Sequence, residues 1–234
     1  MTGGWDPGWR LFGPWHLGIL AAIAVSTWAL RGALLRRPKA AGRTVAVTLA
    51  VGELIWYAYR FKVEGFQFPE GVPLQLCDLT VWLTAFTVIA RRQAVFEFTF
   101  FAGSAGAGMA LLFPDLWAPL CSYPSVYFFF SHGLVVASLA GLAWSGQMRP
   151  MPGCVWRSMA VLNVYAGIVA LFNLAFKTNY MYLCKKPAGA SPLVYLGPWP
   201  WYIVSGEIVA MGLFALLWLP FWARGRWRRP DNPA

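Results

Sequence analysis

Residues 199–223 read WPWYIVSGEIVAMGLFALLWLPFWA, and this stretch decides the class of fold. A helix needs ~20 mostly apolar residues to cross the hydrocarbon core of a bilayer. The stretch exceeds that length, and Glu207 is its only charged residue. It therefore predicts a membrane-spanning helix.

Six further apolar runs of about that length come earlier in the sequence. Each is closed by charged residues, glycine or proline, and the loops between them are too short for a soluble domain. The seven predicted spans cover residues 15–35, 44–61, 74–90, 94–113, 126–145, 157–176 and 199–223. We therefore expect an all-α fold in which residues 1–234 form a single transmembrane domain, a bundle of seven helices.

The composition of the 234 residues points to the same class. Hydrophobic residues make up 59% of the chain and charged residues 12%, whereas soluble domains have ~25% charged residues. The 14 tryptophans and the mean hydropathy of +0.53 also fit a chain surrounded by lipid. A soluble globular protein is excluded. We expect membrane lipids rather than nucleic acid as partners, because the basic residues lie in short clusters between the spans.

The distribution of lysine and arginine predicts the orientation of the bundle. Alternate loops place thirteen basic residues on one side of the membrane and six on the other. Basic residues are enriched in cytoplasmic loops. We therefore expect the amino terminus outside, the carboxyl terminus in the cytoplasm and the loop with Arg91 and Arg92 inside.

A run of small residues occupies positions 103–108 in the fourth predicted span. Small side chains let helix backbones approach each other closely. We expect this helix to lie inside the bundle. The four cysteines do not form a disulfide framework, although Cys121 and Cys184 both fall in predicted outer loops, where a bridge is open to them.

Polar side chains recur at one depth, below the outer headgroups. Glu53, Tyr57 and Arg60 share one helical face because they are four and three residues apart. Ionisable groups inside a span cost at least a few kcal/mol, so they mark sites of function. The further polar residues at this level are Gln75, Cys77, Asp78, His132, Asn173 and Glu207, with Tyr180 in the following loop.

Each of these residues also has a purely structural interpretation. Asn173 and Gln75 fit interhelical hydrogen bonds, and Glu53 with Arg60 fits a buried ion pair. His132 alone fits a core imidazole whose hydrogen bonds are satisfied, and Cys77 alone fits a small buried thiol. What favours function is the combination, because a base beside a thiol activates it as a nucleophile.

Metal or cofactor chemistry has little support in the sequence. His16, His132 and Cys77 are residue types that bind zinc, but no pair of them has the local spacing of a zinc motif. No phosphate-binding loop or dinucleotide fingerprint occurs. We expect no metal and no cofactor.

Five blocks of sequence carry a resemblance to a known family. The chain resembles the YwaF-type bacterial integral membrane proteins, roughly from residue 16 to 220, and these are similar to the eukaryotic transmembrane protein 164 group. The resemblance places the chain in a bacterial inner membrane. The blocks are PLQLCDL at 73–79, FPDL at 113–116, SHG at 131–133, TNYMYL at 178–183 and GPWPWY at 197–202.

The resemblance implies a phospholipid acyltransferase with a membrane-embedded cysteine and histidine. Cys77 takes the place of the nucleophile and His132 that of the base, and an acyl thioester passes to a lysophospholipid or to water. Asn173, Tyr180 or Gln75 would then donate to the oxyanion, and Glu53 or Glu207 would orient His132. Asp78 lies ~100° around the helix from Cys77, so we expect it outside the same pocket.

Two other functions fit the same residues. A transporter would use Glu53, Asp78 and Glu207 to carry protons or cations, and a non-catalytic receptor would bind a small molecule in the polar pocket. Both would tolerate the loss of Cys77. The sequence leaves open the lipid class, the acyl acceptor, the oligomeric state, the protein partners and the pathway.

Overall fold

The computed structural model describes residues 10–116, 118–187 and 192–223, and within these ranges the fold is helical, with no strand. Two short 3₁₀ helices, η1 (Tyr180–Tyr182) and η2 (Pro192–Leu196), precede the last α helix. The α helices are α1 (Pro14–Arg36), α2 (Pro38–Glu64), α3 (Leu76–Ala90), α4 (Gln93–Leu112), α5 (Tyr123–Trp144), α6 (Cys154–Phe176) and α7 (Trp201–Ala223).

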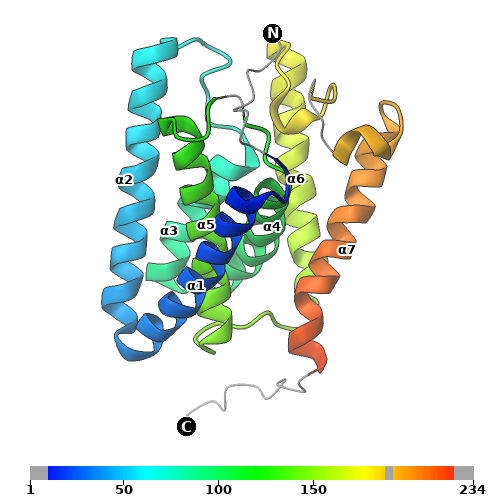
Figure 1. Cartoon of the computed structure of the whole chain (residues 1–234). Coiled ribbons are helices and arrows are strands. Elements are labelled where there is room, and N and C mark those ends of the chain that lie inside the picture. The colour runs from blue at the N-terminus through cyan, green and yellow to red at the C-terminus, as the bar shows by residue number, and fades with distance from the viewer. Residues whose placement is uncertain (1–9, 117, 188–191, 224–234) are drawn as a thin grey trace.

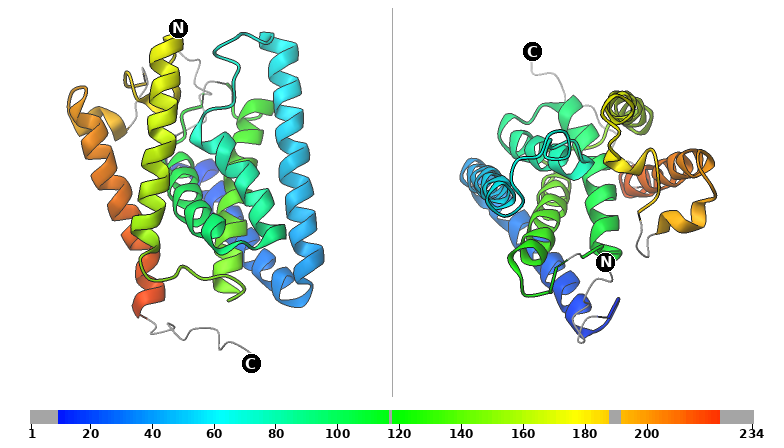
Figure 2. Two further views of the ribbon diagram at one scale, coloured as in Figure 1. Left: turned by 180° about the vertical axis from the view of Figure 1, so that it is seen from behind. Right: turned by 90° about the horizontal axis from the view of Figure 1, so that it is seen from above.

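The helices form one bundle in which successive helices run in opposite directions (Figure 1). We call the end with residues 65–75 and 177–187 the upper end, and the end with residues 91–92 and 145–153 the lower end. Residues 65–75 descend from the top of α2 to the start of α3 (Figures 1 and 2). The first turn of α3 therefore lies below the upper ends of α2 and α6.

The seven helices occupy the seven predicted spans to within a few residues, except that α2 begins at Pro38 instead of residue 44. Five of them, α1, α4, α5, α6 and α7, are long and apolar enough to cross a membrane. α3 is apolar but has only 15 residues, and α2 carries charged residues along its length. That α2 and α3 also cross the bilayer stays a prediction.

Proline and a side-chain cap set several helix boundaries. α1 and α2 are separated by Arg37 alone, whose backbone is non-helical, since Pro38 disfavours the α conformation in the residue before it. Pro14 and Pro124 lie in the first turns of α1 and α5, where a missing N–H is tolerated. At the start of α3, Asp78 Oδ2 accepts a hydrogen bond of 3.3 Å from the Gln75 N–H.

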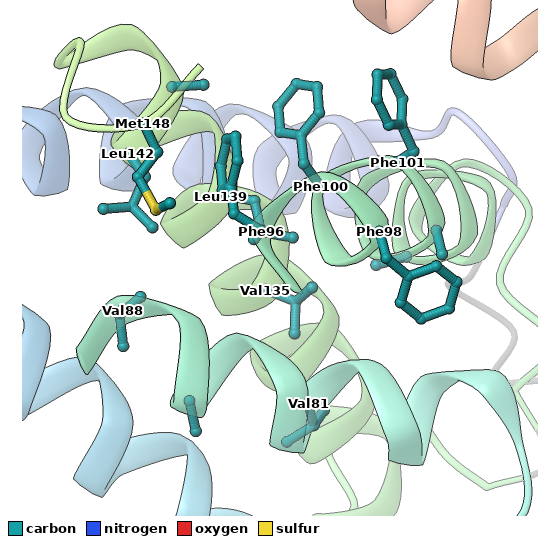
Figure 3. Close-up of a cluster of buried hydrophobic side chains, with 14 of the residues drawn as sticks. Val81, Val88, Phe96, Phe98, Phe100, Phe101, Val135, Leu139, Leu142 and Met148 are labelled. Carbon is teal, nitrogen blue, oxygen red and sulfur yellow. The ribbon is translucent and has the colours of Figure 1, made fainter. Parts of the chain in front are cut away.

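α4 is the central helix of the bundle, as predicted. It packs against α3, α5, α6 and α7, and Phe96 and Phe101 are fully buried. Figure 3 shows Phe96 beside Val135 and Leu139 of α5. Phe101 points away from them, and its ring centroid lies 5.3 Å from that of Phe214 on α7. This core fixes the positions of α3 and α5, which carry the polar residues described below.

The small residues of α4 serve two different purposes. A side chain at Gly103 would meet Leu139 Cδ1 at 3.0 Å, so this position allows the close approach of α5 that the sequence suggested. Gly106 is exposed instead, and a Cβ there would meet only Leu76 Cδ2, at 3.8 Å. At Gly106 the run therefore does not pack closely on another helix.

His16 connects α1 to the upper end of α4. Its side chain is fully buried, Nδ1 accepts a hydrogen bond of 3.0 Å from the Phe12 N–H, and Nε2 lies 2.7 Å from the Leu111 carbonyl oxygen. Since Nδ1 accepts, Nε2 carries the proton and donates. His16 is thus a structural residue whose two ring nitrogens are both engaged.

Candidate functional site

A cavity of about 310 Å³ lies between the upper parts of α2, α3 and α5. It contains four of the residues that the sequence singled out as site candidates, Glu53, Gln75, Cys77 and His132. The remaining lining residues are Trp56, Arg60, Glu64, Asp78, Val81, Pro124, Tyr127, Phe128 and Ser131. A thiol, an imidazole and carboxylates therefore share one cavity.

Glu53 is the most deeply buried acid of this cavity, with 2% of its surface exposed. Its Oε2 accepts a hydrogen bond of 2.6 Å from the Tyr127 hydroxyl. Its Oε1 is buried and has no hydrogen-bond partner among the described residues. An unpartnered buried acceptor costs about 1–3 kcal/mol, so this oxygen marks a place where a donor from a bound molecule would be favoured.

Aromatic rings form the wall around Glu53. Trp56 stacks on Tyr127 with ring centroids 5.4 Å apart, and on Tyr59 at 5.8 Å. Tyr123 packs against Tyr59 at 4.9 Å. Because such rings pack rigidly and bury apolar area, they hold the neighbouring polar groups of α2 and α5 in place.

Cys77 and Asp78 lie in the first turn of α3, and both line the cavity. The expectation that Asp78 would face away from the pocket of Cys77 is therefore wrong. α3 begins at Leu76, so the cavity lies at the start of the helix. There the consecutive residues Cys77 and Asp78 both line it. Asp78 is also the cap of this helix through its bond to the Gln75 N–H.

Gln75 joins this cavity to the loop after α6. Its Oε1 accepts a hydrogen bond of 3.0 Å from the Met181 N–H. The bond fixes the TNYMYL block next to the PLQLCDL block, although the two are far apart in the sequence. It leaves the amide nitrogen of Gln75 as a donor at the cavity.

His132 is oriented by its own helix. Its Nδ1 lies 2.8 Å from the carbonyl oxygen of Phe128, one turn earlier in α5. A carbonyl only accepts, so Nδ1 carries the proton and Nε2 carries the lone pair. Within the described ranges no hydrogen bond engages Nε2, which is the state required of a general base.

Neither acid that the sequence proposed for orienting His132 does so. Glu53 bonds Tyr127, and Glu207 accepts a hydrogen bond of 2.9 Å from Asn163 Nδ2, between α6 and α7 and outside the cavity lining. The proposed ion pair of Glu53 with Arg60 is absent as well, because Arg60 bonds Glu64 at 3.0 Å at the rim.

Two proposed oxyanion donors are occupied elsewhere. Asn173 accepts from the Thr178 hydroxyl and the Tyr180 N–H, both at 2.8 Å, and donates to the Tyr180 carbonyl oxygen. The Tyr180 hydroxyl donates to the Pro69 carbonyl oxygen at 2.8 Å. Both residues shape the loop after α6, and neither lines the cavity.

Tyr57 belongs to α2 and contacts α3 beside the cavity. Its hydroxyl oxygen accepts a hydrogen bond of 3.1 Å from Trp82 Nε1. It also lines a separate cavity with Arg60 and Glu64, the two residues that stand at the rim of the first. Tyr57 thus joins α2 to α3, and it is not part of the lining of the Cys77 cavity.

Several residues of the cavity lining were not among the candidates from the sequence, among them Trp56, Tyr127 and Phe128. Helical spacing was the available signal, since Trp56 is three residues from Glu53, and Tyr127 is four from Ser131. Aromatic residues are so common in this chain that spacing alone does not distinguish a cavity wall from a lipid-facing surface.

The four cysteines are free thiols, so Cys121 and Cys184 form no bridge. Among the described residues, no group of three or more histidines, cysteines and acids is placed to hold a metal ion. His16 and His132 belong to different surroundings: His16 bonds the end of α4, and His132 lines the cavity. The chemistry available at the cavity is therefore that of a thiol, an imidazole and carboxyl groups.

Comparison with known proteins identifies the family. A sequence profile of the TMEM164 family matches residues 11–218. Neither a curated protein nor a solved structure matches the chain significantly. The match covers most of the chain, which therefore belongs to the TMEM164 family. With five helices apolar enough to cross a membrane, it is a multi-pass membrane protein.

Proposed function

We propose that this member of the TMEM164 family is a membrane-embedded phospholipid acyltransferase that works through an acyl thioester on Cys77. The observation that carries the proposal is the shared cavity of Cys77 and His132, with Nε2 of His132 left as a proton acceptor. The substrates are then a phospholipid as acyl donor and a lysophospholipid as acceptor.

The first half-reaction forms the thioester. His132 Nε2 takes the proton of the Cys77 thiol, and Sγ attacks the ester carbonyl carbon of the phospholipid. The carbon–oxygen ester bond then breaks, and the leaving alkoxide of the lysophospholipid receives the proton from His132. A carbon–sulfur bond has replaced a carbon–oxygen bond, and the imidazole is neutral again.

The second half-reaction reverses these roles. His132 removes the proton of the acceptor hydroxyl, whose oxygen attacks the thioester carbonyl. The carbon–sulfur bond breaks, and the thiolate of Cys77 regains the proton. With water as the acceptor the product is a free fatty acid, so a water-poor cavity favours transfer over hydrolysis.

The start of α3 supplies donors for the developing oxyanion. The first N–H groups of a helix have no partner inside the helix. In α3 the Gln75 side chain caps the Asp78 N–H, which leaves those of Leu76 and Cys77 as donors. Together with the amide of Gln75 they replace Asn173 and Tyr180 in the proposed role. The bilayer itself brings ester carbonyls to this depth, which lowers the entropic cost of the reaction.

We place the chain in the YwaF-type bacterial branch and in the inner membrane, on the sequence blocks quoted above. We also propose that the upper end, with the cavity, faces outward, because the lower end carries the larger number of basic residues. The substrate lipids then come from the outer leaflet of that membrane.

A second candidate function is a proton- or cation-coupled carrier. It is favoured by the unpartnered Glu53 Oε1 and by Asp78 in the same cavity. Glu207, the third acid of that hypothesis, bonds Asn163 outside the cavity. A carrier depends on Glu53 and tolerates Cys77→Ala, whereas an acyltransferase does not.

The test is an acyl-transfer assay with purified protein, a radiolabelled phospholipid and a lysophospholipid. Loss of a positioned general base typically costs about 10²–10⁴-fold, so His132→Ala should reduce turnover by that factor. Cys77→Ala should abolish it. The matched control is Cys121→Ala, a free and exposed cysteine outside the cavity, which should keep full turnover. Full turnover in Cys77→Ala would contradict the proposal.

A further inference from the structure

A second cavity, of about 460 Å³, lies between α4 and α7 and reaches the loops of the upper end. On α4 its lining residues recur at helical spacing from Ala102 to Ala110, with Phe113 just past the end of the helix, and on α7 from Gly206 to Phe214. Most of these side chains are small or aliphatic. Figures 1 and 2 show why space remains there: α7 diverges from α6 toward the upper end.

This apolar cavity adjoins the cavity of Cys77. Phe128 lines both of them, so one aromatic ring is their common wall. Leu76, the neighbour of Cys77 in the first turn of α3, lines the apolar one. A molecule whose polar group lies at Cys77 would therefore have apolar space next to it, on the far side of Phe128.

The dimensions of the cavity suit one hydrocarbon chain. Ala102 and Leu112, the last residue of α4, are separated by about 15 Å along the helix, from a rise of ~1.5 Å per residue. One leaflet of a bilayer holds about 15 Å of acyl chain, half of the ~30 Å hydrocarbon core. The volume also falls in the range of about 300–1,000 Å³ that is usual for small-molecule sites.

We propose that the α4–α7 cavity binds the acyl chain that is transferred, and that Gly106 limits the length of that chain. The inference rests on the proposed acyl transfer at Cys77. The chain passes Phe128 from the thioester carbon and lies along the small-residue face of α4. Asp115 and Tyr182, the polar residues of the lining, are near the upper end, at the headgroup level.

Substitution of Gly106 is the most direct test of this proposal. It lines the cavity, and a Cβ there would meet only Leu76 Cδ2 at 3.8 Å, so a larger side chain enters the cavity without a clash with the backbone. Gly206 faces the same space from α7, with nothing within 4 Å. Gly108 offers the matched control on the same helix, because it has nothing within 4 Å and does not line the cavity.

The experiment uses photoreactive phospholipids with a diazirine near the methyl end of one acyl chain, in a series of chain lengths, in nanodiscs with the full-length protein. Cross-links from long chains should map to the deep end of the cavity, at Ala102, Leu213 and Phe214, by mass spectrometry. Gly106→Leu and Gly206→Leu should each reduce long-chain cross-linking and spare short chains, by about fourfold in affinity for each methylene that no longer fits. Gly108→Leu should leave the profile unchanged.

The readout separates this inference from the proposed function, because cross-linking requires no turnover. Cross-links in the cavity without any thioester on Cys77 would support the chain-binding site and overturn acyl transfer. A thioester on Cys77 with cross-links confined to the lipid-exposed face of α6, at Leu171 and Leu174, would overturn the chain-binding site alone. Equal length profiles for Gly106→Leu, Gly206→Leu and Gly108→Leu would also overturn it.

Discussion

At the scale of single residues, the two histidines of the chain show how hydrogen bonding separates structure from function. His16 is buried with both ring nitrogens bonded to backbone groups. His132 has one nitrogen bonded to a carbonyl and the other at a cavity that also holds Cys77. Residue type and predicted depth are the same for both, so the sequence does not distinguish them, whereas their hydrogen-bond partners do.

We therefore expect the loss of His16 to reduce stability and the loss of His132 to reduce turnover. His16→Ala leaves the Leu111 carbonyl and the Phe12 N–H without their partner, at a cost of about 1–3 kcal/mol for such unmet bonds. For a chain of this size that lowers Tm by roughly 2–4 °C per kcal/mol. His132→Ala should change Tm little and reduce turnover. The measurement is thermal unfolding in detergent beside turnover per folded molecule, and an equal loss of Tm in both variants would contradict the assignment.

Glu53 and Tyr127 make a second prediction at this scale. Tyr127→Phe leaves both carboxylate oxygens of buried Glu53 without a partner, so the free energy of unfolding should fall by about 1–3 kcal/mol. Replacing both residues, Glu53→Met with Tyr127→Phe, removes the unmet acceptors and should restore most of the stability. A double-mutant cycle by thermal unfolding measures the coupling, and strict additivity of the two losses would argue against the bond.

At the scale of helices, close contacts are set by glycine. A Cβ at Gly42 of α2 would lie 2.6 Å from the Val88 carbonyl oxygen of α3, so Gly42→Ala must push the two helices apart. We expect a loss of about 1–3 kcal/mol, typical of overpacking. Gly167→Ala in α6 has nothing within 4 Å and should stabilise by roughly 0.5–1 kcal/mol, since alanine favours helix. Comparable Tm values for the two variants would contradict this packing.

The helices themselves could be predicted from sequence because hydropathy and chain punctuation are local properties. Apolar length located all seven, and proline marked several of their beginnings. Predictions from helical spacing failed at the boundary of a helix. Asp78 shares the cavity of Cys77 because α3 begins only two residues before it. Such predictions also failed for α4, whose small-residue run packs closely at Gly103 and lines open space at Gly106.

The candidate site was predictable in part for the same reason. Depth along each span brought Glu53, Gln75, Cys77 and His132 together correctly. Depth does not say which side of a helix faces the cavity. Asn173 and Glu207 were therefore predicted at the same level as Cys77, but they bond Tyr180 and Asn163 outside the cavity. The carbonyl that orients His132 belongs to the backbone and leaves no residue-type signal at all.

At the scale of the whole molecule, the distribution of charge predicts how the bundle sits in the membrane. The seven predicted spans, with thirteen basic residues in the loops expected on one side, predict that the loop with Arg91 and Arg92 lies in the cytoplasm. A reporter protein that is active only in the cytoplasm should be active when it is fused after residue 92. A reporter that is active only after export should be active when it is fused in the loop 65–75. The reverse pattern, or the same side for both loops, would contradict the orientation.

The two cavities are enclosed by different helices of the bundle. α2, α3 and α5 enclose the polar cavity, and α4 with α7 encloses most of the apolar one. Phe128 of α5 separates them. In our two proposals, the chemistry at Cys77 and the binding of a hydrocarbon chain therefore belong to different helices.

The most direct test of acyl transfer at Cys77 is to capture the thioester. Purified protein is incubated briefly with a phospholipid labelled in one acyl chain, then digested, and the peptide with Cys77 is analysed by mass spectrometry before and after hydroxylamine. The expected result is one acyl adduct on Cys77 that hydroxylamine removes, absent from Cys77→Ala and strongly reduced in His132→Ala. Turnover of the phospholipid with no adduct on Cys77 at any time would contradict it.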